Sequence, residues 1–530
     1  MIKNLLKQRL NKSNHSLTFL LLLLFSLVLP GSLLIIPESK SKQGSFLTNS
    51  LFVYAIEVIV ILLFLFLLFK FLESIYISTN KPSVNKLYIF YYALPSIAVG
   101  FYYLIALYPG IMTNDSFNQW MQVHTHSLYA WHPVPHTIFI YFVTKLWDSP
   151  AAVAIAHMTL QSLVLGYILY IFNKLGVNKK LLYLIAILGS LYPSNAVMSI
   201  AIWKDIPYNA SLSLLTIFIL NILITKGKWL DNHLNNVAFI CCSVIVVLFR
   251  HNGLLSFIGT MFLGLLLLRY KRKTIGLILV SVLSVYILVK GPIYSYLNVK
   301  PGTSNEAFGI PTQQIAAVVK NNGYLTPQQK EKINYIMPLD VMAETYHPYS
   351  VDLIKFHDEF DRNAIVNDKV GFLKLWFDIC IQNPAIVTKA FLDQTSLVWQ
   401  IKEPLGRGYT FTANREVVRN DYNIKNKIIS EPITSSVYKI LDFTEKKENI
   451  WLFWRPALLL FIILFAGLLC IRKNDITFLL LVSPVLLNNL SILAAIPAQD
   501  YRYLHANNLI SIIIVLASFI KLNSNISKEF

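Results

Sequence analysis

The chain has 530 residues, of which 55% are hydrophobic and only 14% are charged, and its mean hydropathy is +0.54. This composition excludes an ordinary soluble globular protein, because too few charged side chains are present to cover a surface in water. The net charge of +18 is not a nucleic-acid signal, because the Lys and Arg residues cluster in short segments between apolar runs. Such clusters indicate membrane topology and contact with anionic lipid. We therefore expect a protein of the lipid bilayer with no nucleic-acid partner.

Apolar runs of about twenty residues recur along the chain, and that length crosses a hydrocarbon core of about 30 Å. They predict about twelve transmembrane helices, at residues 16–37, 51–72, 87–108, 151–173, 181–201, 206–225, 235–250, 254–268, 274–296, 452–471, 475–496 and 504–521. The two shortest runs, 235–250 and 254–268, could instead form one helix pair that dips around the polar Arg250-His251-Asn252-Gly253 segment.

Basic residues orient these spans. The N-terminal segment MIKNLLKQRLNK carries four of them ahead of the first span, so it should stay in the cytoplasm. When spans are counted from there, every short loop that is predicted to be cytoplasmic is also basic. These loops carry Lys81/Lys86, Lys174/Lys179/Lys180, Lys226/Lys228, Arg269/Lys271/Arg272/Lys273 and Arg472/Lys473. The sequence therefore predicts a multi-pass protein of the cell membrane with both termini in the cytoplasm.

One long charged segment, residues 297–450, interrupts the series of spans and is external by the same count. Within it, Thr326-Pro327-Gln328-Gln329 has the pattern of a capped helix N-terminus. Asn383-Pro384 begins another helix that runs to about Trp399. We expect an all-α polytopic membrane protein with an α-helical extracytoplasmic domain inserted before the last three spans. Its predicted parts are 1–86 (cytoplasmic tail and two extra helices), 87–296 (membrane core), 297–450 (extracytoplasmic domain) and 451–530 (last three helices).

The predicted outer loop at residues 109–150 is rich in reactive side chains. A simple connector between membrane helices would need only residues such as Ser, Gly and Asn. The stretch YPGIMTNDSFNQWMQVHTHSLYAWHPVPHT instead contains Asn114, Asp115, Gln119, His124, His126, His132 and His136. Ionisable groups that cluster at a membrane edge indicate a functional site, so we expect this loop to form part of one.

Three later groups of polar residues fall at the same face by the span count. They are Lys204 and Asp205 in AIWKDIPYN, then Arg250, His251 and Asn252 in FRHNG, and finally Asp500, Tyr501 and Arg502 in PAQDYRYLH. Charged residues near the bilayer centre cost about 2.5–3.5 kcal/mol each, so they require partners, water or a ligand. A carboxylate with several cations and imidazoles suits an anionic headgroup, above all a lipid phosphate.

These motifs resemble the GT-C superfamily, which comprises multi-pass glycosyltransferases that use polyprenyl-phosphate-linked sugars. The strings YPGIMTNDSFNQW, WHPVPHT, WKD, RHNG and QDYRY are also similar to an uncharacterised GT-C-like family common in Gram-positive bacteria. The resemblance covers the chain from about residue 87. Two features depart from the GT-C pattern. Asp115 follows the third span instead of the first, which two extra N-terminal helices explain, and it stands alone where many members have two adjacent acidic residues.

The resemblance implies transfer of a sugar from a polyprenyl-phosphate donor to a cell-envelope polymer, glycolipid or protein, with inversion at the anomeric carbon. It makes Asp115 the general base that deprotonates the acceptor hydroxyl. The departing phosphate needs cations, and the candidates for binding the donor are Lys204, Arg250, Arg502, His132 and His136. Supporting residues are expected at Asn114, Gln119, Asp205, His251, Asn252, Asp500 and Tyr501. The sequence leaves the cofactor open: a divalent metal is compatible with the chemistry, but no motif indicates one and no residue is assigned to a metal site.

Each candidate also has a purely structural interpretation. Asp115 could cap an interfacial helix. Arg250 and Arg502 could be interfacial side chains whose charged ends reach water. Lys204 and Asp205 could form a local ion pair of little energetic weight. The coincidence of all these groups at one predicted face favours the functional interpretation.

Two other functions remain open. The first is a zinc site built from His124, His126, His132 and His136, but Pro133 and Pro135 break the helical i, i+4 spacing of zinc proteases. The second is a transporter or flippase of lipid-linked saccharides. Transporters carry ionisable residues near the bilayer midplane, on broken helices in repeated halves. Here the charges lie at the outer edge and no repeat is visible, which favours an enzyme.

Overall fold

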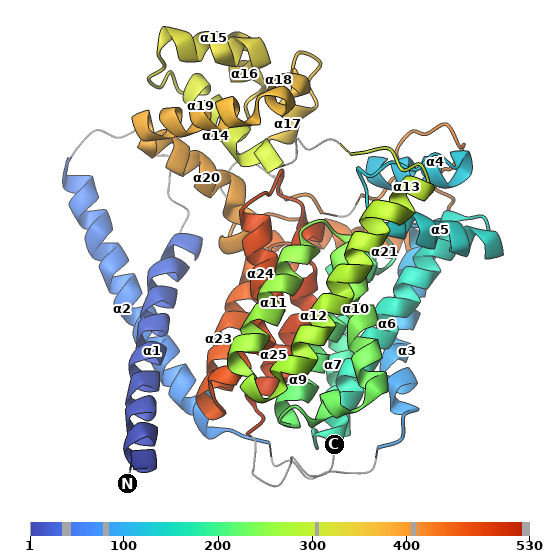
Figure 1. Cartoon of the computed structure of the whole chain (residues 1–530), viewed down its shortest axis with the longest axis vertical. Helices are drawn as coiled ribbons and strands as arrows, with labels where there is room; N and C mark the ends of the chain where they lie inside the picture. Colours follow the sequence, from blue (N-terminus) through green and yellow to red (C-terminus); the bar gives the residue numbers. More distant parts are fainter. Residues whose placement is uncertain are drawn as a thin grey trace.

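The computed structural model describes residues 2–33, 44–77, 84–302, 307–403, 410–412 and 414–521. Within these residues the regular secondary structure is helical, and β-pairing occurs only as isolated bridges. Long helices run side by side in a bundle, and a smaller helical unit lies over one end of it (Figure 1). The predicted all-α fold is therefore confirmed. The predicted basic residue Lys81 lies outside the described residues.

A helix coincides with each of the twelve predicted apolar runs over most of its described residues. The corresponding helices are α1 (Ile2–Leu33), α2 (Gly44–Ser74), α3 (Tyr88–Ala106), α6 (Pro150–Lys174), α7 (Lys179–Leu191), α9 (Asp205–Ile224), α10 (His233–Phe249), α11 (Gly253–Leu267), α12 (Arg272–Leu288), α23 (Ala457–Lys473), α24 (Leu479–Leu493) and α25 (Ala506–Ser518). Helix α9 is central, and almost all of its residues are buried. Its sequence is mostly apolar on every face, so it can be covered on every side.

Helix length gives a lower number of spans than the apolar runs predict. Six of the described helical stretches are long and apolar enough to cross a membrane, and up to eight if two bent pairs each count as one span. The bent pairs are α7 with α8 (Pro193–Ser199), at 70°, and α19 (Lys369–Gln382) with α20 (Pro384–Trp399), at 111°. Helices α10 and α11 have only 17 and 15 residues, fewer than the roughly 20 that a span requires. These apolar helices are compatible with a polytopic membrane protein.

The outer unit has a hydrophobic core of its own. Its helices are α14 (Gly309–Lys320), α15 (Pro327–Ile336), α16 (Leu339–Thr345), α17 (Asp352–Lys355), α18 (Arg362–Asn367), α19 and α20. Buried side chains such as Ile315, Ile333 and Phe372 form this core. The predicted N-terminus of α15 is confirmed, with Thr326 and Gln329 in a capping box, and α20 begins after Asn383 as expected.

The C-terminal part of the predicted 297–450 domain packs elsewhere. Helix α21 (Glu431–Thr444) lies against α3, and its Val437 and Leu441 join Tyr103 and Trp454 in a separate core at the end of the bundle.

The remaining elements are short. They are α4 (Asn114–Thr125), α5 (Val134–Leu146), α13 (Tyr294–Tyr296), α22 (Ile450–Phe453), the π-helix η3 (Val289–Ile293) and the 3-10 helices η1 (Lys228–Asp231), η2 (Arg269–Lys271), η5 (Ile476–Phe478) and η6 (Tyr501–Leu504).

The outer unit is joined to the end of the bundle by backbone hydrogen bonds. The N–H of Val351 donates to the carbonyl of Pro497 (2.9 Å), and Ser350 forms a β-bridge with Ala498. The chain that follows α13 is fixed at the same end, because the N–H of Ala130 donates to the carbonyl of Lys300 (2.9 Å). The unit therefore lies at the same end of the bundle as α4 and α5 of the 109–150 loop, which are beside it in Figure 1.

Candidate functional site

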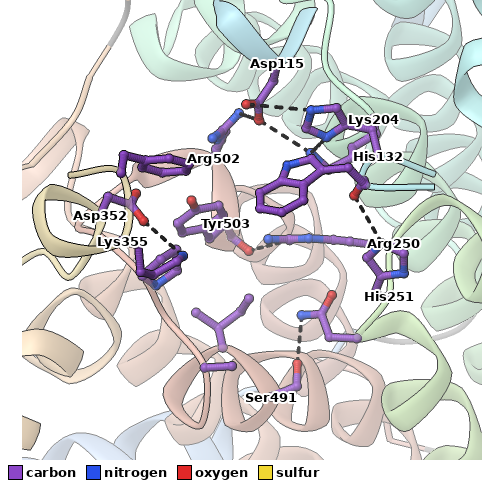
Figure 2. Close-up of a pocket in the computed structure, with 16 residues that line it drawn as sticks. Asp115, His132, Lys204, Arg250, His251, Asp352, Lys355, Ser491, Arg502 and Tyr503 are labelled. Carbon is purple, nitrogen blue, oxygen red and sulfur yellow. Dashed lines mark hydrogen bonds and ion pairs between the residues drawn. The ribbon is translucent and has the colours of Figure 1, made fainter. Parts of the chain in front are cut away.

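Helix termini from distant parts of the chain meet around one cavity beneath the outer unit. The cavity has a volume of about 280 Å³ and is lined by 16 residues. Seven of the predicted site residues line it, namely Asp115, His132, Lys204, Arg250, His251, Asn252 and Arg502. Figure 2 shows Asp115 facing Arg502 and Lys204, with Arg250 and Tyr503 deeper in the site. The span count that placed these motifs at one face therefore predicted a real cluster.

A short extended contact brings Asp115 and Lys204 together. The N–H of Ile111 donates to Ile200 (3.2 Å), and the N–H of Ile202 donates to Ile111 (3.0 Å). This pairing aligns the chain before α4 with the chain before α9. Gly110 precedes it at φ +116°, where a Cβ would lie 3.1 Å from the Ile200 carbonyl. Glycine is therefore required at this close approach.

The first turn of α4 presents Asp115 without using it as a cap. The helix begins at Asn114, and the residue at the N-cap position is Thr113. The Thr113 N–H donates to Ser116 Oγ (3.2 Å), and Ser116 Oγ donates to the Ile202 carbonyl (2.9 Å). The carboxylate of Asp115 is left to point at the cations of the cavity, where the helix N-terminus also favours a negative charge.

Arg502 is the nearest partner of Asp115. Its Nη1 donates to Asp115 Oδ2 at 2.8 Å, and its Nε lies 2.8 Å from Asp500 Oδ2. Asp500 also caps η6 by accepting from the Arg502 N–H (3.0 Å). The guanidinium lies over the ring of Trp203, 5.1 Å from the centroid. Two carboxylates and an aromatic face thus fix the orientation of this arginine.

Lys204 and His132 complete the surroundings of Asp115. Lys204 Nζ lies 3.6 Å from Asp115 Oδ2 and 3.3 Å from His132 Nδ1. An ammonium can only donate, so His132 Nδ1 accepts, and its protonated Nε2 faces Asp115 Oδ1 at 3.9 Å. Burial and the nearby Lys204 lower the pKa of His132 to about 3, so this imidazole is neutral at physiological pH.

The electrostatic state of Asp115 is that of a firmly ionised carboxylate. Burial alone would raise its pKa, but the positive charges of Lys204 and Arg502 hold the pKa of Asp115 well below its usual value. A general base is most effective when its pKa lies near the working pH. In this arrangement Asp115 is therefore a weak base.

Arg250 is held in a tight turn between α10 and α11. Its Nε lies 3.2 Å from the buried Asp205, its Nη1 donates to the Tyr503 carbonyl (2.9 Å), and its guanidinium lies between the rings of Tyr208 and Tyr503. The turn closes at Gly253, where a Cβ would lie 2.0 Å from the Val246 carbonyl. These contacts explain the FRHNG motif, because a bulkier residue after Asn252 would push Arg250 out of place.

The outer unit contributes lining residues that the sequence did not reveal. They are Asp352, Lys355 and Phe356, from α17 and the position after it. Lys355 is only 5% exposed, and its Nζ donates to Asp352 (3.2 Å). Residues 352–362 contain several charges of both signs, so no local pattern distinguished Lys355 from a solvated surface residue.

Other predicted site residues lie outside the lining of the cavity. His136 is fully buried, with its Nδ1 2.8 Å from Gln119 Oε1 and its Nε2 3.3 Å from His157 Nε2. Tyr501 is also buried and shares its hydroxyl with Ser194 (2.9 Å). Asn114 is exposed, beside Asp115. Asp205 and Asp500 lie just behind the lining and pair with Arg250 and Arg502. These residues support the site from behind or stabilise the bundle.

The four histidines of the outer loop have four different environments. His124 contacts Asp148 (3.2 Å), His126 ends α4 in a left-handed conformation, His132 contacts Lys204, and His136 contacts His157. Among the described residues, no group of three or more His, Cys, Asp or Glu side chains is arranged to hold a metal ion. The described arrangement therefore gives no support to the zinc interpretation.

Charges in the cavity are balanced in pairs. The cations that line it are Lys204, Arg250, Lys355 and Arg502, and their carboxylate partners are Asp115, Asp205, Asp352 and Asp500. An anionic ligand would thus have to exchange with a carboxylate to reach a cation. Ion pairs that an incoming anion can exchange suit a site in which an anion binds and leaves.

Comparison with known proteins identifies the family of the chain but not its activity. No match was found among curated proteins or among solved structures. One family model matches residues 98–527, and these include every residue that lines the cavity. The chain therefore belongs to the family described as a family of unknown function (DUF6020).

Proposed function

We propose that this protein is a membrane glycosyltransferase, which moves a sugar from a polyprenyl-phosphate donor to a cell-envelope acceptor on the outer face. The observation that carries the proposal is one cavity at the ends of apolar helices, in which Asp115 is paired with Lys204 and Arg502 and two further cations, Arg250 and Lys355, line the wall. Cations are the groups that stabilise a departing phosphate, and a carboxylate is a suitable base for a hydroxyl.

In the proposed reaction, Asp115 takes the proton of the acceptor hydroxyl. The acceptor oxygen forms a bond to the anomeric carbon, and the bond from that carbon to the phosphate oxygen breaks. Its electron pair leaves with the polyprenyl phosphate, where Lys204 and Arg502 stabilise the charge. A single displacement of this kind inverts the anomeric centre. Arg250 and Lys355 would hold the other phosphate oxygens or the sugar.

The apolar part of the cavity suits a lipid-linked substrate. Phe356, Ile492, Ala495 and Pro497 line it beside the charged groups, so an isoprenoid chain and its phosphate could each meet a compatible surface. The lining residues come from helix termini and the loops between them. A transporter places its site near the middle of its helices, so this position favours an enzyme.

The proposed topology has about twelve spans, both termini in the cytoplasm and the outer unit outside the cell. The basic residues on which this topology rests make their contacts at the end of the bundle away from the outer unit. Lys271 pairs with Asp231, Arg472 Nε lies 2.8 Å from Glu73, and Lys473 donates to the carbonyl of Ser518 (2.8 Å). Helix α1 also begins at that end (Figure 1), as a cytoplasmic N-terminus requires.

Cysteine labelling tests this topology. In a variant whose four natural cysteines are replaced, a cysteine at Asn321, an exposed position after α14, should react with an impermeant thiol reagent in intact cells. A cysteine at Lys228, in the opposite loop, should react only after lysis. The reverse pattern would contradict the topology, because Asp115 would then face the cytoplasm.

The Lys355→Met variant tests the contribution of the outer unit to the donor site. Removal of the ammonium should weaken donor binding by about tenfold, as expected for the loss of one charge-assisted hydrogen bond. Lys389→Met is the matched control, because Lys389 also pairs with an aspartate on its own helix (Asp393, 2.6 Å) but lies on the surface. Equal donor affinity in both variants would exclude Lys355 from the site.

The proposed reaction itself can be tested by mass spectrometry of cell-envelope polymers. Cells without this protein should lack a hexose or aminosugar on one polymer, glycolipid or protein, and the wild-type chain should restore it. The chain carrying Asp115→Asn should not restore it. An unchanged envelope in cells without the protein, together with altered transport of a lipid-linked saccharide, would favour the transporter.

A further inference from the structure

Asp115 is held by the same cations that the proposed function assigns to the donor phosphate. We propose that the donor phosphate displaces Asp115 from Lys204 and Arg502, and that Asp115 becomes the catalytic base only when this exchange has occurred. Donor binding would thus make the Asp115 carboxylate available as a base. The inference rests on the proposed function and names how that same site is regulated.

The geometry shows the competition directly. Asp115 Oδ2 accepts from Arg502 Nη1 at 2.8 Å and lies 3.6 Å from Lys204 Nζ, while Oδ1 faces His132 Nε2 at 3.9 Å. Both oxygens are therefore directed at protein groups. The oxygen that Arg502 now occupies, Oδ2, would become free for an acceptor hydroxyl when the cations turn to another anion, and the phosphate is the anion that the site would bind.

Other charged groups around Asp115 keep the charges of the cavity balanced during the exchange. From η6, Asp500 still neutralises Arg502 when Asp115 leaves, and Tyr503 lies beside them. From α9, Asp205 remains paired with Arg250. Across the cavity lie His251 and, in the outer unit, the Asp352–Lys355 pair. Thus Lys204 and Arg502 are the cations whose partner changes when a phosphate enters.

The exchange changes the basicity of Asp115 in a definite direction. In the free protein, burial would raise the pKa of Asp115, but Lys204 and Arg502 lower it below the usual value. A bound phosphate would cancel much of that positive charge, so the pKa of Asp115 should rise toward the working pH. The carboxylate would then be a better base at the moment when a sugar is present for transfer. Premature proton uptake by Asp115 in the free protein would be disfavoured.

Binding of farnesyl phosphate to the purified full-length protein tests the competition without catalysis. Asp115→Asn removes the competing negative charge, so farnesyl phosphate should bind about tenfold more tightly, the scale of one charge-assisted hydrogen bond. Asp148→Asn is the control, because Asp148 is an exposed aspartate of the same loop, paired only with His124 among the contacts described. Equal or weaker binding by Asp115→Asn than by the wild type would overturn the inference.

The pH dependence of turnover gives a second, independent test. The acid limb of the pH profile of kcat/KM reports the pKa of the base in the free protein. The acid limb of the profile of kcat reports the pKa of the base in the donor complex. Since donor binding raises the pKa of Asp115, the acid limb of kcat should lie at higher pH than that of kcat/KM. Lys204→Met should move the acid limb of kcat/KM to higher pH and so bring it closer to the acid limb of kcat. Lys389→Met should leave both acid limbs at the same pH as in the wild type.

The two levels of the proposal fail in different ways. Sugar transfer with coincident acid limbs, or with their order reversed, would overturn the exchange and leave the proposed function standing. A complete lack of transfer from any polyprenyl-phosphate sugar would overturn the proposed function. The binding measurement would then still decide whether an isoprenoid phosphate and Asp115 compete for Lys204 and Arg502.

Discussion

Asp115→Asn is expected to lower sugar transfer by roughly 10²–10⁴-fold, the usual scale of general base catalysis. The amide has the same shape as the carboxylate but cannot take a proton from the acceptor hydroxyl. Helix α4 should still form, because its N-cap position is occupied by Thr113 and Asp115 makes no capping hydrogen bond in the structure. Initial rates with a polyprenyl-phosphate sugar, measured for purified wild-type and variant protein, check this expectation.

The control for this experiment is again Asp148→Asn. Asp148 lies in the same outer loop, and its side chain is 63% exposed and contacts His124. Loss of its charge should leave transfer unchanged, which separates the role of Asp115 from a general effect of charge in the loop. Full activity of Asp115→Asn would end the base assignment and would return Asp115 to a purely structural role in pairing with Arg502.

Arg502→Ala should have the second-largest effect, and it should act on donor binding. Loss of a charge-assisted hydrogen bond to phosphate corresponds to about 1.5–3 kcal/mol, or a rise in donor Kd of roughly 10- to 150-fold. Arg502→Lys should recover only part of the affinity, because an ammonium cannot make the paired contacts of a guanidinium. The measurement is the Kd for a polyprenyl phosphate in detergent or nanodiscs.

A matched arginine controls for the structural cost of Arg502→Ala. Arg415 also bridges two carboxylates, Asp442 and Glu445, but it does not line the cavity. Arg415→Ala should therefore leave the donor Kd unchanged. If both variants bind the donor equally well, the phosphate is held by other groups and the assignment of Arg502 is wrong. Thermal unfolding of each variant shows whether the fold is retained.

The sequence by itself determined where the helices lie. Apolar runs of sufficient length formed helices at all twelve expected places, because burial of apolar side chains and local hydrogen bonding both act over short stretches. Local caps were equally predictable, as the Thr326–Gln329 capping box and the start of α20 at Pro384 show. The span count also placed Asp115, Lys204 and Arg502 at one face, since helix direction alternates along the chain.

Tertiary structure alone decided which of these residues touch. Asp115 and Arg502 are 387 residues apart, and their hydrogen bond depends on how η6 and α4 pack. His136 looked like a donor ligand from its position in the loop, but the rotation of α5 turns it into the core toward Gln119. Side-chain direction on a short helix depends on packing, which neighbouring sequence does not encode.

The outer unit gives the clearest case of information absent from local sequence. Lys355 enters the cavity because Val351 binds Pro497 and thereby places α17 over the end of the bundle. Nothing in the charged stretch around Lys355 predicts this, since a solvated lysine and a ligand-binding lysine have the same local pattern. Composition and hydropathy thus determined a helical membrane protein with a polar face. Long-range packing decided that these polar groups line one cavity, in which Asp115 is paired with the cations proposed to bind the donor, because only contacts between distant segments fix the positions of its walls.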